Sequence, residues 1–155
     1  MRRPSIAPGI LLGIGLGGFL DGIVLHQILQ WHHMLSAEES VRTVDGLETN
    51  TLADGLFHAA TWLITLAGTF VAVRAWRAGE IAPPWSFHIG AMLLGWGLFN
   101  FVESADHLIV GIHHVRDDLG GPVEWDIGFL LFAIALIAAG LAMTRREVRS
   151  RRETP

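Results

Sequence analysis

The histidines of this 155-residue chain follow a spacing that is typical of a binding site. A single histidine followed, after five other residues, by a histidine pair occurs twice: at His26, His32 and His33, and at His107, His113 and His114. Carboxylates lie close to both copies in the sequence. Neutral imidazoles that converge with carboxylates are suited to binding transition metals. The pattern therefore predicts a metal site.

The composition indicates that a membrane surrounds the elements that must position these groups. The chain is 51% hydrophobic and 17% charged, with a mean hydropathy of +0.43. These values are typical of a small integral membrane protein. Histidine and carboxylate are costly to bury in a bilayer, so a cluster of them indicates a functional site. The absence of cysteine excludes disulfides, iron–sulfur clusters and thiolate metal sites.

Four apolar segments are each near the roughly 20 residues that a helix needs to cross a bilayer. They cover about residues 8–31, 54–73, 85–110 and 124–144. We therefore expect an all-α integral membrane protein, a four-transmembrane-helix bundle that forms one domain over residues 1–155. The intervening residues 32–53 are expected to form a polar loop.

The positive charges predict the orientation of the bundle. The chain has no lysine, and its arginines lie mainly near the two termini and in the turn at 74–84. Only Arg42 and Arg116 lie on the other side. The positive-inside rule then places both termini in the cytoplasm, with residues 145–155 as a basic cytoplasmic tail. Trp31 and Trp125 would mark the outer interface.

An internal repeat accompanies the histidine motifs. The segment Gly15-x-Gly17-x-Phe19 matches Gly95-x-Gly97-x-Phe99, and one inserted residue then aligns the two histidine motifs. This pattern predicts two parallel helical hairpins, related by a pseudo-two-fold axis along the membrane normal.

Helical periodicity of 100° per residue selects the candidate ligands, because polar stripes on membrane helices point into the bundle. The groups that share inward faces, or lie beside them, are His26, His33, His58, His107, His114, Asp21, Asp54 and Glu103. His32 and His113 fall off the main faces, where a ligand role and a solvated position at the membrane edge are equally compatible with the pattern. His88 belongs to the opposite end and is left out.

The number of candidate ligands exceeds what one tetrahedral ion can use. Two ions, or one ion with a proton-transfer site, would use them better. Asp54 and His58, like Glu103 and His107, are one helical turn apart. Such pairs either ligate a dinuclear centre or orient a ligand by hydrogen bonding. The expected depth of these residues places the site near the outer face.

Several blocks of the chain resemble the DUF2243 family of predicted bacterial membrane proteins. They are residues 18–34, 54–58, 100–107 and 113–116, and the resemblance spans nearly all of the chain. It implies a location in the bacterial inner (plasma) membrane. Some members resemble neighbours or fusion partners of factors that assemble copper-containing respiratory oxidases, which implies copper as a candidate metal.

The leading hypothesis is a membrane metalloprotein that binds copper, iron or zinc. If it is an enzyme, oxidation with oxygen or hydrolysis by metal-bound water is expected. The alternatives are a copper carrier or insertion factor that partners a respiratory oxidase or its assembly factors, and a b-type haem protein. The other expected partners are the lipid bilayer and, through the glycine ridge Gly9, Gly13 and Gly17, a second copy in a homodimer. No nucleic-acid partner is expected.

Overall fold

The computed structural model describes residues 4–80 and 83–153. Within these ranges the chain is helical and contains no strand, which confirms the expected fold class. The elements are α1 (Ala7–Asp21), the π-helix η1 (Gly22–Ile28), α2 (Val44–Arg77), α3 (Trp85–Ala105), the π-helix η2 (Asp106–Val110), the 3-10 helix η3 (Asp117–Leu119) and α4 (Val123–Glu153). Arg2 and Arg3, and the side chains of the expected basic tail beyond Arg146, lie outside the described residues.

The helix limits follow local sequence signals. The third membrane segment runs from Trp85 to Val110, as expected. The second helix begins at Val44 rather than near Asp54, because Thr43 caps it by accepting a 3.1 Å hydrogen bond from Gly46 N. The polar loop before it is correspondingly shorter than the sequence suggested.

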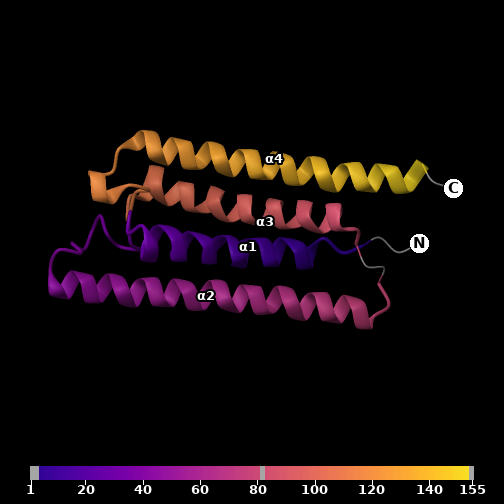
Figure 1. Cartoon of the computed structure of the whole chain (residues 1–155), viewed down its shortest axis with the longest axis horizontal. Coiled ribbons are helices and arrows are strands. Elements are labelled where there is room, and N and C mark those ends of the chain that lie inside the picture. Colours follow the sequence, from indigo (N-terminus) through magenta and orange to yellow (C-terminus); the bar gives the residue numbers. More distant parts are fainter. Residues whose placement is uncertain (1–3, 81–82, 154–155) are drawn as a thin grey trace.

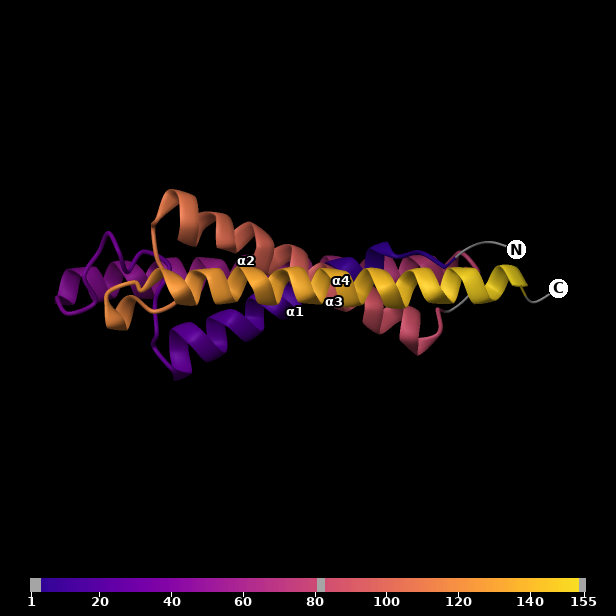
Figure 2. The same cartoon turned by 90° about the horizontal axis from the view of Figure 1, so that it is seen from above.

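Two central helices cross in an X, and a further helix flanks each of them. Figure 2 shows α1 and α3 crossing near the middle of the molecule. Figure 1 shows α2 lying along α1 and α4 along α3, and these three pairs make the main contacts. Among the described residues, no close backbone approach joins α1 to α4 or α2 to α3. The start of α1 and the end of α4 lie at the same end of the bundle as the turn between α2 and α3.

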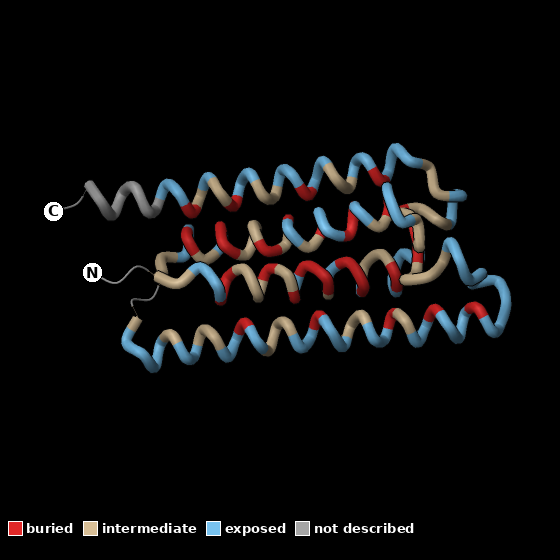
Figure 3. Tube along the Cα trace, turned by 180° about the vertical axis from the view of Figure 1, so that it is seen from behind, coloured by how far each residue is buried: buried red, intermediate tan, exposed pale blue. Residues whose placement is uncertain are grey.

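The distribution of polarity is the reverse of that in a water-soluble protein. Figure 3 shows buried residues concentrated on the two central helices. The largest fully buried side chains are polar, with His26, Asp54 and Asn100 among them. By contrast, Phe70 and Leu131 are 71% and 61% exposed on the outer helices. Because four helices are also long and apolar enough to cross a bilayer, the chain is a four-helix membrane bundle with lipid as the solvent of its outer face.

Glycines set the close approach of the two central helices. A Cβ on Gly13 would overlap the carbonyl oxygen of Met92, and a Cβ on Gly95 would overlap that of Ile10. These reciprocal contacts make Gly13 the structural counterpart of Gly95. The register therefore differs by two residues from the match of glycine motifs in the sequence, because a glycine-rich helix offers several similar alignments.

The glycine ridge is used within the chain. A Cβ on Gly9, Gly13 or Gly17 would meet Ala91, Met92 or Trp96, all on α3. The ridge therefore packs against α3 of the same chain and is not free to pair with a second copy.

Candidate metal centre

Both central helices end in a π-helix, and this changes which side chains face inward. In a π-helix the hydrogen bond spans one residue more than in an α-helix, so the rotation of 100° per residue no longer holds. η1 has seven residues and η2 has five. In the register that pairs Gly13 with Gly95, the first repeat is the longer one before its single histidine, and it carries the longer π-helix. The chain then reverses through left-handed residues at equivalent positions, Gln30 with φ 50° and Gly111 with φ 77°.

This reversal brings the first histidine of each pair back into the bundle. His32 and His113 are each 2% exposed, as is His107, and His26 is fully buried. With the buried carboxylates Asp21 and Glu103 they form what we call the histidine cluster: Asp21, His26, His32, Glu103, His107 and His113. Two overlapping groups, Asp21–His26–His32–Glu103 and His32–Glu103–His107–His113, have candidate ligand atoms that all lie within 4.8 Å of one another.

The cluster has pseudo-two-fold symmetry. Within the first repeat, the rings of His26 and His32 meet edge to face with centroids 4.5 Å apart. The counterparts His107 and His113 do the same at 4.8 Å. His32 and His113 stack on each other across the axis at 4.9 Å. The register set by Gly13 and Gly95 makes Asp21 the counterpart of Glu103, so each repeat contributes one carboxylate and two imidazoles.

Asp54 fixes the tautomer of His26. The Nδ1 of His26 lies 2.9 Å from Asp54 Oδ1, and a neutral ring bonded in this way leaves the lone pair on Nε2. That Nε2 lies 3.3 Å from Asp21 Oδ2. Two acceptors at this distance need a cation or a proton between them. Donor atoms around a metal with bonds of about 2.0–2.1 Å lie roughly 3–3.4 Å apart.

His32 is also held with its lone pair toward the cluster. Its Nδ1 lies 3.0 Å from the carbonyl oxygen of Val115, so Nδ1 must be the donor. Burial lowers the pKa of His32 to about 3, which keeps the ring neutral at physiological pH. The Nε2 lone pair is buried and has no hydrogen-bond partner. This is the state that a metal ligand requires.

The imidazole rings of the second repeat have fewer hydrogen bonds to hold their orientation. Burial lowers the pKa of His113, so this ring is also neutral. Its Nδ1 lies 2.9 Å from Asp106 Oδ2 but forms no hydrogen bond. Neither nitrogen of His107 has a partner. Glu103 Oε1 lies 3.7 Å from His113 Nε2, and Oε2 is unpaired.

The unpaired polar atoms are concentrated in this one place. Among the residues that the structure describes, every buried side-chain nitrogen or oxygen without a hydrogen-bond partner belongs to the histidine cluster or to Asn100. Native proteins leave only a few such groups per 100 residues, and each one calls for an explanation such as a bound ion or water. The lone pairs of four imidazoles and two carboxylates are an arrangement that fits a transition metal.

The other predicted ligands lie around the cluster rather than in it. His33 Nδ1 lies 2.6 Å from Asp54 Oδ2, and His114 Nδ1 lies 2.8 Å from Asp126 Oδ2. His58 Nδ1 donates to the carbonyl oxygen of Asp54, 2.7 Å away. The structure thus brings Asp21, His26, Glu103 and His107 together and places Asp54 behind His26.

His32 and His113 are the cluster members that helical periodicity did not select. The signal that could have found them was the repeat itself. The same spacing separates each of them from the single histidine of its own copy, whereas the face argument assumed a continuous α-helix through a segment that is π-helical and then turns.

The fold and the site together define a class: a polytopic α-helical membrane protein with a buried histidine/carboxylate cluster. The model of the DUF2243 family, described as a predicted membrane protein, matches residues 8–147, so the chain belongs to this family. The resemblance seen in the sequence is thereby confirmed. No curated protein and no solved structure matches the chain.

Proposed function

We propose that this protein is a membrane-embedded metalloprotein whose histidine cluster binds a dinuclear transition-metal centre. The observation that carries the proposal is the convergence of unpaired, buried imidazole and carboxylate atoms on one small volume. A single tetrahedral ion would use four donors, whereas the cluster offers six. Each repeat supplies a similar set of three, which favours one ion for each repeat.

Only a carboxylate of the cluster can bridge two such ions. His32 belongs to both overlapping groups, but its Nδ1 is committed to Val115 and only Nε2 remains. Glu103 is the other shared member and has two oxygens. Asp21, His26 and His32 would then hold one ion and His107 and His113 the other, with Glu103 within reach of both.

The donor set favours iron or zinc over Cu(I). Soft copper(I) sites usually recruit thiolate or thioether sulfur, and the cluster contains only nitrogen and oxygen. Carboxylates and histidines from facing helices are also the donors of the di-iron carboxylate proteins. A copper carrier or insertion factor is therefore the less favoured alternative. Its ligands would also need to be accessible for exchange, whereas these are buried.

The packing of the rings argues against haem. A b-type haem needs a planar gap between two axial histidines. Here His32 stacks on His113 with an interplanar angle of 25°, and both rings contact His26 and His107. Such close packing of the imidazoles disfavours a macrocycle between them.

The experiment that tests the proposal is elemental analysis of protein purified in a mild detergent, with an optical spectrum. The key variant is His32→Ala/His113→Ala, and the matched control is His33→Ala/His114→Ala, which alters the neighbouring residue of each pair. We expect about two metal ions per chain in the wild type and the control, and at least a tenfold loss in the key variant. A Soret band would redirect the assignment to haem.

Two results would overturn the proposal. One is an absence of stoichiometric metal in folded wild-type protein supplied with iron, zinc and copper. Protons and water would then satisfy the cluster. The other is equal metal content in the two double variants. One ion per chain would retain the metal site but reject the dinuclear assignment.

A further inference from the structure

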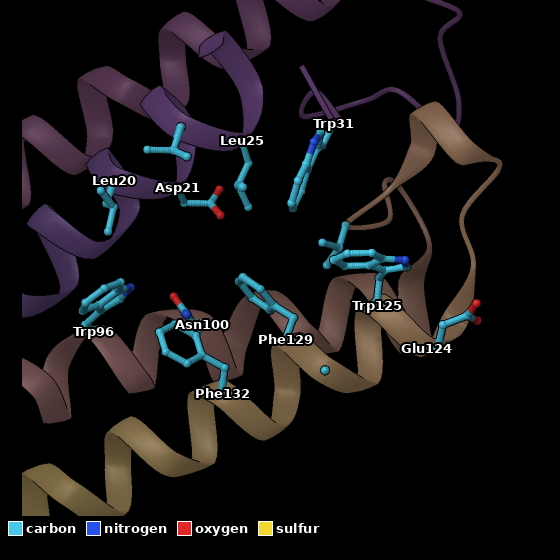
Figure 4. A pocket seen from close by; sticks show the side chains of 13 residues that line it. Leu20, Asp21, Leu25, Trp31, Trp96, Asn100, Glu124, Trp125, Phe129 and Phe132 are labelled. Atoms are coloured by element: carbon cyan, nitrogen blue, oxygen red, sulfur yellow. The ribbon is translucent and has the colours of Figure 1, made fainter. Parts of the chain in front are cut away.

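A cavity of about 480 Å³ lies beside the histidine cluster, in the gap between α1 and α4. Figure 4 shows the side chains that line it, with Trp31 and Trp125 at one end and Trp96 and Phe132 toward the other. The guanidinium of Arg116 lies over the rings of Trp31 and Trp125, at 4.4 and 4.9 Å from their centroids. The cavity is within the size range of small-molecule sites.

The base of this aromatic cavity is polar. The carboxylate of Asp21 and the amide of Asn100 point into it (Figure 4). Both side chains are more than nine-tenths buried, and Asp21 Oδ2 and Asn100 Oδ1 have no hydrogen-bond partner. Leu20 and Phe132 at the rim are exposed and belong to membrane-spanning helices. The cavity therefore leads from the lipid-facing surface to two unpaired acceptors.

The pseudo-two-fold repeat provides an internal comparison. A second cavity of about 310 Å³ lies in the equivalent gap between α2 and α3 and includes Glu103 and His113 in its lining. Its lining has no tryptophan. The repeat places other residues at the positions of these tryptophans. The alignment of the histidine motifs pairs Trp31 with Ile112, and the pairing of Gly13 with Gly95 matches Trp96 with Ile14. The pairing of Asp54 with Asp126 matches Trp125 with Ala53. Each of the two cavities thus contains the carboxylate of its own repeat, but of the two only the cavity between α1 and α4 is lined by tryptophan.

We infer that the aromatic cavity binds a membrane-soluble aromatic alcohol, of the chemical class of hydroquinones and alkylphenols. Its ring would stack among the tryptophans, and its hydroxyl would donate its single proton to the carboxylate of Asp21, beside Asn100. The inference rests on the proposed function, because Asp21 belongs to both sites and would bring the hydroxyl to the metal centre. An acyl chain fits the cavity less well, since it would leave both buried acceptors unpaired.

The test measures quenching of tryptophan fluorescence by a short-chain alkylhydroquinone, under anaerobic conditions, in protein reconstituted into lipid nanodiscs. The ligand control is the dimethyl ether of the same molecule, which keeps the ring and chain but cannot donate. The protein variant is Gly128→Leu, because Gly128 lines the cavity and a Cβ there meets nothing within 4 Å. Gly55→Leu is the matched control on the outer face of α2, also with open space around its Cβ.

We expect saturable binding that is weakened at least tenfold by Gly128→Leu, unchanged by Gly55→Leu, and at least tenfold weaker for the dimethyl ether. Non-saturable quenching, equal binding by the two variants, or equal binding of the ether would overturn the inference. Metal content is measured on the same samples. Metal without hydroquinone binding rejects only this inference, and hydroquinone binding without metal rejects only the proposed function.

Discussion

At the scale of single residues, adjacent histidines have different environments. His32 is buried with its lone pair turned into the cluster, whereas the next residue, His33, hydrogen-bonds to Asp54. Asp54 in turn accepts from His26, His33 and the backbone of Met34. A carboxylate behind a ligating histidine fixes its tautomer and raises its basicity. We therefore regard Asp54 as a positioning residue for His26.

This role predicts the effect of Asp54→Asn. The amide keeps the size of the side chain but removes the charge and offers only one acceptor oxygen. Metal affinity should fall by about 10- to 100-fold, the usual effect of losing such a partner, while the metal-to-protein ratio at saturation stays the same. Competition against a chelator of known affinity measures this, with His88→Ala at the opposite end of α3 as the control. An unchanged affinity would show that His26 does not depend on Asp54.

At the scale of elements, the site depends on how closely α1 and α3 approach each other. The reciprocal glycine contacts let the two backbones touch where the helices cross, and the π-helices beyond that crossing carry the cluster. Small residues at such crossings are the usual means of close packing in membranes. Any change that separates the helices should also move the two halves of the cluster apart.

We predict that Gly13→Ala and Gly95→Ala destabilise the protein to similar extents, because each new methyl group would meet the backbone of the partner helix. Overpacking of this kind costs about 1–3 kcal/mol, and metal retention should fall with it. The measurement is thermal unfolding in detergent, followed by circular dichroism. Gly128→Ala is the control, since a Cβ there has open space. A large difference between the two variants would contradict the reciprocity of the contacts.

At the scale of the whole molecule, the cluster lies at the end of the bundle opposite the start of α1 and the end of α4. The arginine distribution favours a cytoplasmic location for those ends, and we therefore propose that the metal centre lies near the outer face of a bacterial inner membrane. A metal ion would then reach it from outside the cell or from the periplasm.

Cysteine labelling tests this orientation directly, because the natural chain has no cysteine to interfere. Glu39 in the loop before α2 and Ala78 after it are both exposed. In intact spheroplasts, a membrane-impermeant maleimide should label Glu39→Cys and leave Ala78→Cys unlabelled until the membrane is permeabilised. The reverse pattern would place the metal centre at the cytoplasmic face.

The sequence by itself determined the parts of this protein that depend on composition and simple periods. Long apolar segments need internally satisfied backbone in lipid, so four membrane helices followed from hydropathy alone. The repeated histidine spacing likewise indicated a duplicated site. His26, His107, Asp21 and Glu103 were placed together because they lie on or near the α-helical part of each segment.

The tertiary structure decided what depends on contacts between helices. Two π-helices and two left-handed residues turn His32 and His113 inward and direct His33 and His114 to neighbouring carboxylates, and no period of 3.6 residues describes such a path. The glycine register that pairs Asp21 with Glu103 was also settled only by backbone contact. Hydropathy depends on each residue's own affinity for lipid, whereas the ligand set depends on which distant groups can come within a few ångströms of each other.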